Sequence, residues 1–206
     1  MSASPRRCVV MIGTALGGRG GMSSVAAAYS AAGLFARVPV CYIEAHREVS
    51  VLGKLWLVVS GLAQLFGMLI SGKVALLHVH AASGISFWRK RLFIRLGKIF
   101  SRPVVVHLHG GEFLEFYRSC SARQQTLVRR TLESADRVIV LSSTWRDRLG
   151  EISDRLHTVV LPNPVAVPID AAVRDGKEFR ILFLGRLERA KGVFELIEAF
   201  ALLRHI

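Results

Sequence analysis

Two cations five residues apart, Arg186 and Lys191, follow a short apolar run late in the sequence. A guanidinium can bind a phosphate through two parallel hydrogen bonds, and an ammonium adds a point charge. The run Ile181–Leu184 is typical of a buried parallel strand, and Val193–Arg204 of the helix after the turn. The pair therefore predicts a clamp for a diphosphate. The alternative is two exposed cations without a ligand.

The segment Gly13–Ser24 is glycine-rich and lies between a predicted strand and a predicted helix. In that position, backbone N–H groups and the helix N-terminus can receive a phosphate. It is neither a Walker A loop nor a complete G-x-G-x-x-G motif, because Gly18 and Gly20 are followed by Ser23. We expect Gly18, Gly20 and Gly21 to contact an anionic or sugar ligand. A tight turn without a ligand is the alternative.

Four histidines form two H-x-H pairs at predicted strand ends, His78 with His80 and His107 with His109. Residues at i and i+2 of a strand point to the same face. A dinuclear metal site would need carboxylates, and only two glutamates lie close in the sequence, so no metal is expected. One histidine of each pair is expected to bind backbone or substrate. His109, directly before two glycines, is best placed to face a ligand.

The predicted helix Ser83–Ser101 interleaves cations with aromatic residues. This pattern favours contact with an anionic membrane or a lipid phosphate, with an ordinary solvated face as the alternative. No nucleic-acid partner is expected, because no helix-turn-helix, RNP or zinc-finger pattern is present. The expected contacts are Trp88, Arg89, Lys90, Arg91 and Arg95.

The net charge of +13 lies mostly in the first half. Residues 1–100 carry 12 Lys and Arg against two acidic residues, whereas 101–206 carry 16 against 13. Nucleic acid, anionic lipid and phosphorylated small molecules all suit such a charge, which alone does not choose among them. The 51% hydrophobic content excludes a disordered chain. Three cysteines without C-x-x-C spacing favour reduced thiols in a cytosolic protein.

Six apolar runs alternate with helix-like segments. This alternation predicts an α/β fold, a Rossmann-like doubly wound parallel sheet with its ligand crevice at the carboxyl ends of the strands. A proline-rich stretch, Pro162–Pro168, predicts an interdomain linker. The predicted strands are Arg7–Ile12, Val38–Ile43, Val74–His80, Pro103–Leu108, Asp136–Leu141 and His157–Leu161, and the remaining predicted helices are Met22–Ala36, Ala122–Ser134 and Ser143–Gly150.

Two apolar segments raise the question of a membrane. Leu55–Ser71 has 17 residues without a charge, near the lower limit for a span, but two glycines and Gln64 favour a helix packed on the sheet. A helix in the membrane interface is the third option. Near the N-terminus, the apolar run Cys8–Leu16 is too short for a convincing signal peptide, so we expect a first strand and no export.

The motifs GGRGGMSS, HVHAAS, VVVHLHGGEF, ADRVIVLS, VVLPNPV and FLGRLERAKGVFELIEAF occur in order along nearly the whole chain. Together they resemble the GT-B retaining glycosyltransferases of the group-1, or family 4, type. In that family two Rossmann-like domains face each other across a cleft, the first holding the acceptor and the second the nucleotide-sugar. The resemblance implies an acceptor-side domain at 1–165, a linker at 166–177 and the start of the donor domain at 178–206.

The resemblance also implies residue roles. Gly18, Gly20 and Gly21 match the loop near the donor phosphates and acceptor. His109 matches the histidine that contacts the transferring sugar. Arg186 and Lys191 match the cations on the donor diphosphate, where they would stabilise the departing nucleotide without a metal.

The implied activity is transfer of a hexose from a nucleotide diphosphate sugar to a glycan or lipid-linked acceptor, as in polysaccharide biosynthesis. No cofactor is expected, and the expected location is cytoplasmic, peripheral on the inner membrane face. The family's E-x7-E element belongs beyond Ile206, so the 206-residue chain alone is expected to be inactive. The alternatives are a non-catalytic acceptor-binding or membrane-docking module and an oxidoreductase, the latter disfavoured by the broken dinucleotide motif.

Overall fold

The computed structural model describes residues 7–18, 21–165, 181–185 and 187–203. Contacts between Cα atoms divide the chain into two units, residues 1–166 and 167–206. The predicted linker at 166–177 lies outside the described residues.

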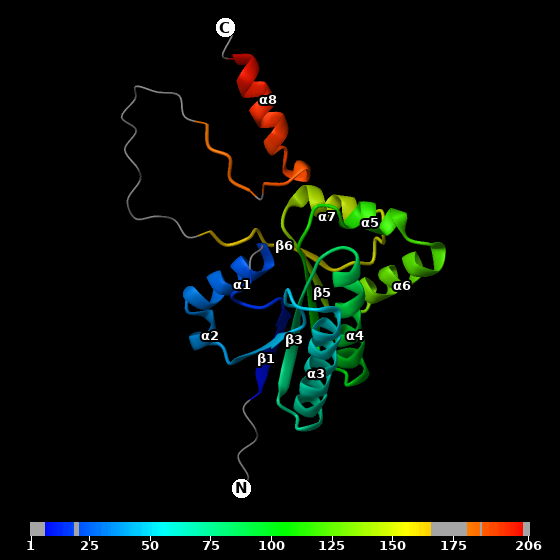
Figure 1. The fold of residues 1–206 in the computed structure, drawn as a ribbon. Helices are drawn as coiled ribbons and strands as arrows, with labels where there is room; N and C mark the ends of the chain where they lie inside the picture. The colour runs from blue at the N-terminus through cyan, green and yellow to red at the C-terminus, as the bar shows by residue number, and fades with distance from the viewer. Residues whose placement is uncertain (1–6, 19–20, 166–180, 186, 204–206) are drawn as a thin grey trace. The chain divides into compact units, whose positions relative to one another are not determined.

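Six parallel strands form one sheet in the order β2-β1-β3-β4-β5-β6, with α3 and α4 side by side on it (Figure 1). The predicted α/β parallel fold is confirmed. The strands are β1 (Cys8–Gly13), β2 (Val40–Glu44), β3 (Val74–Ala81), β4 (Val104–Leu108), β5 (Arg137–Val140) and β6 (Thr158–Val160). The helices of the first unit are α1 (Gly21–Ala31), α2 (Leu34–Arg37), α3 (Val51–Ile70), α4 (Ile85–Ile99), α5 (Phe113–Ser119), α6 (Ala122–Glu133) and α7 (Ser143–Leu149).

The apolar run near the N-terminus is a strand, as expected, because β1 pairs with β2 on one side and β3 on the other. After β2 the chain crosses to the opposite side of β1 to form β3. A doubly wound sheet opens its ligand crevice where the strand order reverses in this way, at the carboxyl ends of the strands. The loops after β1 and β3 are therefore the expected place for a ligand.

The two faces of the sheet differ in chemistry. On one face Val79 pairs with Val106, and both are fully buried in a core to which Phe87 of α4 contributes. Because neighbouring residues of a strand point to opposite faces, the next register pair, His80 with His107, lies on the other face. The main core and the histidines therefore occupy opposite faces of the same central strands.

Helix α3 packs through one face only. Among the described helices it is the one long and apolar enough to cross a membrane, with 20 residues, a mean hydropathy of 1.6 and 22% of that apolar window buried. A Cβ added at Gly61 would come within 3.1 Å of Ile43 and 3.2 Å of Phe93, so this glycine permits close approach to β2 and α4. The expected packing on the sheet holds for this face, while the opposite apolar face is exposed.

Two helices differ from the sequence predictions. The predicted helix Met22–Ala36 is split into α1 and α2, with Gly33 at a φ of 76° between them, a left-handed conformation that glycine adopts without strain. Helix α5 was not predicted, because the HGGE segment directly before it has the composition of a loop. In the first unit, all three cysteines are free, in agreement with the expected thiols.

The second unit contains a short 3₁₀ turn, η1 (Arg189–Lys191), and α8 (Val193–Leu203). The predicted strand at Ile181–Leu184 is wrong: these residues form no strand, and Leu182 and Leu184 are 84% and 92% exposed. A parallel strand needs a neighbour for its backbone hydrogen bonds. The described residues of this unit contain no other strand to supply them.

Candidate active site

A cavity of about 430 Å³ lies beyond the carboxyl ends of β1 and β2. Its lining comes from the turn after β1, the first turn of α1 and the segment that follows β2, including Gly18, Gly21 and His46. Gly20 lies outside the described residues. The glycine-rich turn is thus part of a cavity beside the reversal in strand order, as the sequence predicts, and its contact with a ligand stays a prediction.

Local hydrogen bonds hold this turn close to the sheet. The N–H of Gly18 donates to the carbonyl of Ala15 at 3.0 Å, and the hydroxyls of Thr14 and Ser23 lie 3.0 Å apart. A Cβ at Gly18 would lie 3.0 Å from both the Ala15 carbonyl and the Ser23 hydroxyl. Gly18 is therefore required by close approach, and its exposed surface faces the cavity.

Lys90 is only 1% exposed, so its predicted contact with a membrane is wrong. Its Nζ donates to the carbonyl of Gly13 at 2.9 Å, at the point where β1 becomes the glycine-rich turn. Burial, and then the charge of Arg89, lowers the pKa of Lys90 to about 7. A signal for this burial was present in the sequence, because Lys90 continues the helical stripe of Phe87, Ile94 and Gly97.

Arg89 also turns toward the crevice. Its guanidinium Nη1 donates to Nδ1 of His46 at 2.6 Å, and His46 lines the cavity. Burial, then the charge of Arg89, lowers the pKa of His46, which keeps the ring neutral and able to accept this hydrogen bond. Helix α4 thus brings two basic side chains to the carboxyl ends of β1 and β2, where the charge of Arg89 beside His46 favours an anionic ligand.

The four predicted histidines form one cluster. Ring centroids of His80 and His107 lie 5.1 Å apart, and those of His107 and His109 lie 4.1 Å apart. His80 Nδ1 and His109 Nε2 share a hydrogen bond of 2.8 Å. Burial lowers the pKa of His78 and His109 to about 4 and of His107 to about 2, and holds that of His80 well below its usual value, so all four rings are neutral at pH 7.

The cluster alters the expected position of His109. Its backbone N–H donates to the carbonyl of Ala81 at 2.7 Å, which fixes it beside the end of β3. The side chain is 7% exposed and hydrogen-bonded to another histidine rather than open to solvent. The sequence placed each H-x-H pair on one face, but the pairing of His80 with His107 depends on strand register, which periodicity does not reveal.

Comparison with known families gives the identity of this domain. The family described as glycosyl transferase 4-like domain matches residues 5–164. The chain belongs to this family. No curated protein matches the chain. The match extends from β1 to β6, so the cavity, Lys90 and the histidine cluster all lie within the glycosyl transferase 4-like domain. The predicted resemblance is confirmed, and with it a sugar donor and an acceptor in general.

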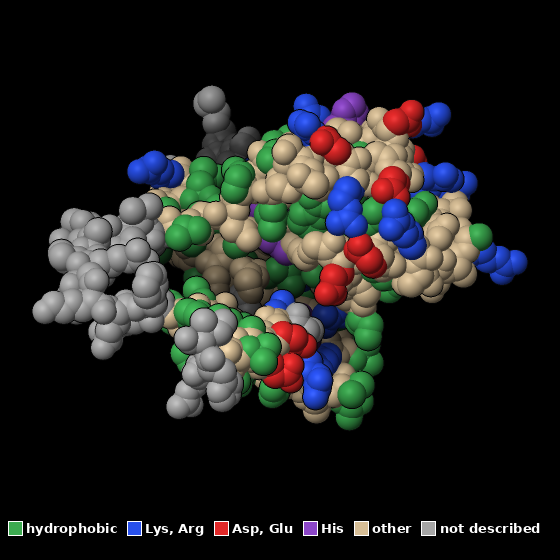
Figure 2. Space-filling view, turned by 90° about the horizontal axis from the view of Figure 1, so that it is seen from above, with side chains coloured by type: hydrophobic (Ala, Val, Ile, Leu, Met, Phe, Trp, Pro, Cys, Tyr) green, Lys and Arg blue, Asp and Glu red, His purple; other side chains and the backbone are tan. Residues whose placement is uncertain are grey.

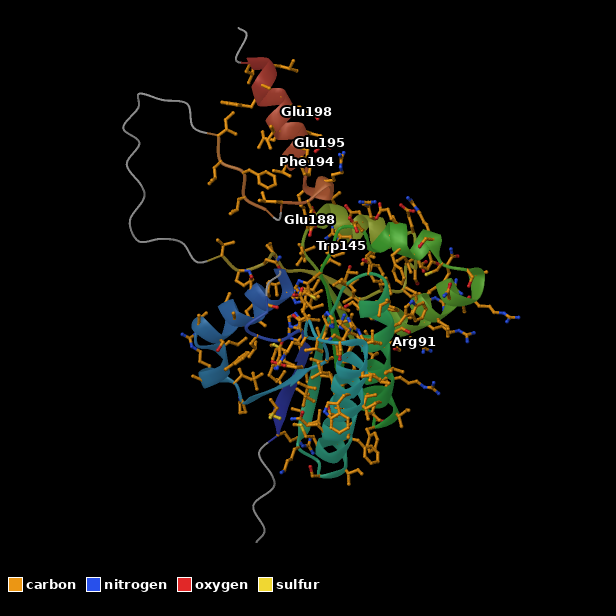
Figure 3. All side chains as sticks on the ribbon, viewed as in Figure 1. Arg91, Trp145, Glu188, Phe194, Glu195 and Glu198 are labelled. Atoms are coloured by element: carbon orange, nitrogen blue, oxygen red, sulfur yellow. The ribbon has the colours of Figure 1, made fainter. Side chains whose placement is uncertain are left out.

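The remaining predicted site residues do not join the cavity of the glycosyl transferase 4-like domain. Trp88 is half-buried against Phe116, with ring centroids 6.2 Å apart. Arg91, which Figure 3 labels, donates from Nε to the Thr131 hydroxyl of α6 at 3.2 Å. Of the five predicted membrane contacts, Arg95 alone is exposed.

The two predicted diphosphate ligands belong to the second unit. Lys191 is exposed in η1, and Arg186 lies outside the described residues. The guanidinium of Arg189, also in η1, lies 5.4 Å from the ring centroid of Phe194, which Figure 3 labels at the start of α8. Their role toward a diphosphate stays a prediction.

Proposed function

We propose that residues 1–165 are the acceptor-side domain of a retaining glycosyltransferase. The enzyme would transfer a hexose from a nucleotide diphosphate sugar to a glycan or a lipid-linked acceptor. The observation that carries this proposal is the cavity after β1 and β2, which a closely held glycine turn lines together with His46, the hydrogen-bond partner of Arg89. A hydroxyl-rich acceptor with an attached phosphate suits backbone N–H groups and the arginine of this lining, Arg47.

The proposed residue roles follow the family pattern. A neutral His109 would hydrogen-bond the transferring sugar, and its low pKa means that it would not act as a charged acid at pH 7. Residues 166–177 would link to a donor domain that begins at 178. There Arg186 and Lys191 would neutralise the diphosphate without a metal ion.

Ligand binding by the chain of residues 1–206 tests the acceptor role. In saturation-transfer NMR against glycans and polyprenyl-diphosphate-linked glycans, we expect signal from at least one lipid-linked saccharide. Gly18→Val should abolish it, because the added side chain crowds Ala15 and Ser23. Gly67→Ala is the matched control, since a Cβ there meets nothing within 4 Å. Saccharide binding that is unchanged by Gly18→Val would show that the acceptor does not bind in this cavity.

Transfer activity tests the division between two domains. The exposed Ile181–Leu184 segment and the exposed Lys191 do not form a built donor pocket among the described residues. We therefore expect purified residues 1–206 to transfer no sugar from UDP- or GDP-sugars. Measurable transfer from either donor class would contradict this assignment.

A second proposal concerns the membrane. We propose that the domain docks on the anionic cytoplasmic face of a membrane through the outward face of α3, which presents an apolar stripe at helical spacing. This stripe consists of Leu52, Leu55, Trp56, Val59, Ala63, Phe66 and Ile70, all exposed. Leu92, Arg95 and Ile99 of α4 line a shallow groove with Phe66 and so add both apolar surface and a cation.

Ion pairs involve both α5 and α7. Arg118 pairs with Glu151, and Arg148 of α7 pairs with Glu115 of α5. Figure 2 shows Lys and Arg side chains beside Asp and Glu side chains in the same way. These ion pairs favour the α3 stripe over α5 and α7 as the membrane contact.

A further inference from the structure

Three imidazoles on the two central strands offer nitrogen atoms that all lie within 4.8 Å of one another: those of His78, His80 and His107. His78 and His80 occupy positions i and i+2 of β3, and His107 is the register partner of His80 on β4. A strand pair in the middle of a sheet is a rigid support, so the three rings are held beside one another without help from a loop.

The polar atoms of this cluster are not satisfied by the described part of the chain. His78 Nε2, His80 Nε2 and both ring nitrogens of His107 are buried without a hydrogen-bond partner there. His80 and His107 are 1% and 0% exposed. Buried polar atoms normally have partners, so four such atoms in one place require an explanation.

We propose that His78, His80 and His107 bind one transition-metal ion, with Zn²⁺ as the expected ion. Neutral imidazoles each offer a lone pair, and a site of three histidines is an established zinc composition that leaves a fourth position for water. The absence of carboxylates among the ligands disfavours Mg²⁺ and Ca²⁺. Nitrogens bound to one tetrahedral zinc at about 2.0–2.1 Å lie roughly 3.4 Å apart, so the stacked rings of His78 and His107 must rotate toward the ion to close the site.

The hydrogen bond between His80 and His109 supports this site. A metal on His80 Nε2 leaves the proton on Nδ1, which then donates to Nε2 of His109 at the observed 2.8 Å. Metal-bound histidines usually donate their second N–H in this way. The proton of the neutral His109 ring is then fixed on Nδ1. If His109 contacts the sugar, as the proposed function has it, the metal would orient that ring without touching the diphosphate.

Metal titration of the chain tests the site without any activity measurement. Residues 1–206, stripped with EDTA, are titrated with Zn²⁺ by calorimetry and with Co²⁺ by visible absorption. We expect about one ion per chain and the absorption of a low-symmetry nitrogen site. His78→Gln, His80→Gln and His107→Gln should each weaken binding more than about tenfold. His157→Gln, at an exposed histidine outside the cluster, is the matched control and should bind as the unaltered chain does.

Nitrogen-15 NMR of the unaltered chain covers the case in which a variant does not fold. Zn²⁺ should shift the cluster nitrogens and leave those of His157 unchanged. No bound ion, shifts confined to other histidines, or equal affinity in folded His80→Gln and His107→Gln would each overturn the metal site. None of these readouts depends on glycan binding or sugar transfer, so failure of the proposed function leaves the metal result interpretable.

Discussion

Lys90 holds an ammonium in the core with the Gly13 carbonyl as its one described acceptor. Burial removes water from the amine and so disfavours its charged form, which lowers the pKa of Lys90 to about 7. The unfolded chain keeps the ordinary value near 10.5 and so holds more protons between pH 7 and pH 10.5. The cost of burying the charge is fully present below pH 7 and declines as pH rises through this window.

Lys90→Met should remove this pH dependence. Between pH 7 and pH 9, Lys90 should raise the unfolding free energy of the unaltered chain by up to about 1.4 kcal/mol per pH unit, and the variant should lack that rise. Urea denaturation at pH 7, 8 and 9 measures it. Lys73→Met, at an exposed lysine, is the control. Parallel pH profiles for the unaltered chain and Lys90→Met would show that burial does not lower the pKa of Lys90.

At the level of elements, α4 depends on a small residue for its contact with the sheet. A Cβ at Gly97 would lie 2.7 Å from Cδ2 of the fully buried Leu77 and 3.3 Å from Val104. We expect Gly97→Ala to lower the unfolding free energy by about 1–3 kcal/mol through overpacking. Gly67→Ala, in open space on α3, should be neutral or raise it by up to about 1 kcal/mol. Equal effects on denaturation midpoints would contradict this packing.

The exposed stripe of α3 makes a prediction about membranes. Trp56→Glu should abolish cosedimentation with vesicles that contain anionic lipid, because it puts a negative charge into the apolar contact. Arg95→Gln should weaken binding and reduce its salt dependence. Val165→Glu, 82% exposed but outside α3, is the matched control. Vesicle binding that is unchanged by Trp56→Glu would show that α3 does not form the membrane contact.

The sequence predicts an element well when the signal for it is local, and poorly when the element depends on a pairing partner elsewhere in the chain. Runs such as Val74–His80 are apolar enough to indicate a buried strand on their own, and the sheet follows from their alternation with helices. Ile181–Leu184 has the same local signal, yet it forms no strand, because strand pairing is a tertiary property. The burial of Lys90 could have been found from its helical stripe, whereas the contact of His80 with His107 required the register.

At the level of the whole molecule, the chain divides after residue 166. The first unit contains the whole six-stranded sheet and nearly all of the described core, and the second adds the buried Val193. We expect residues 1–166 alone to unfold cooperatively, with a melting temperature within about 2 °C of that of residues 1–206, which corresponds to less than about 1 kcal/mol. Calorimetry of both chains measures this. A loss of cooperativity would mean that the first unit needs the second.

The direction of β1 has a practical consequence. All six strands run the same way, so Cys8 at the start of β1 lies at the amino ends of the strands, opposite the cavity at their carboxyl ends. A tether to a sensor surface, attached before Cys8, would therefore hold the domain with its crevice facing the solution. A tether placed just after β6 would be attached at the carboxyl ends of the strands, on the same side as the crevice. Immobilised binding measurements on this domain should use the amino end.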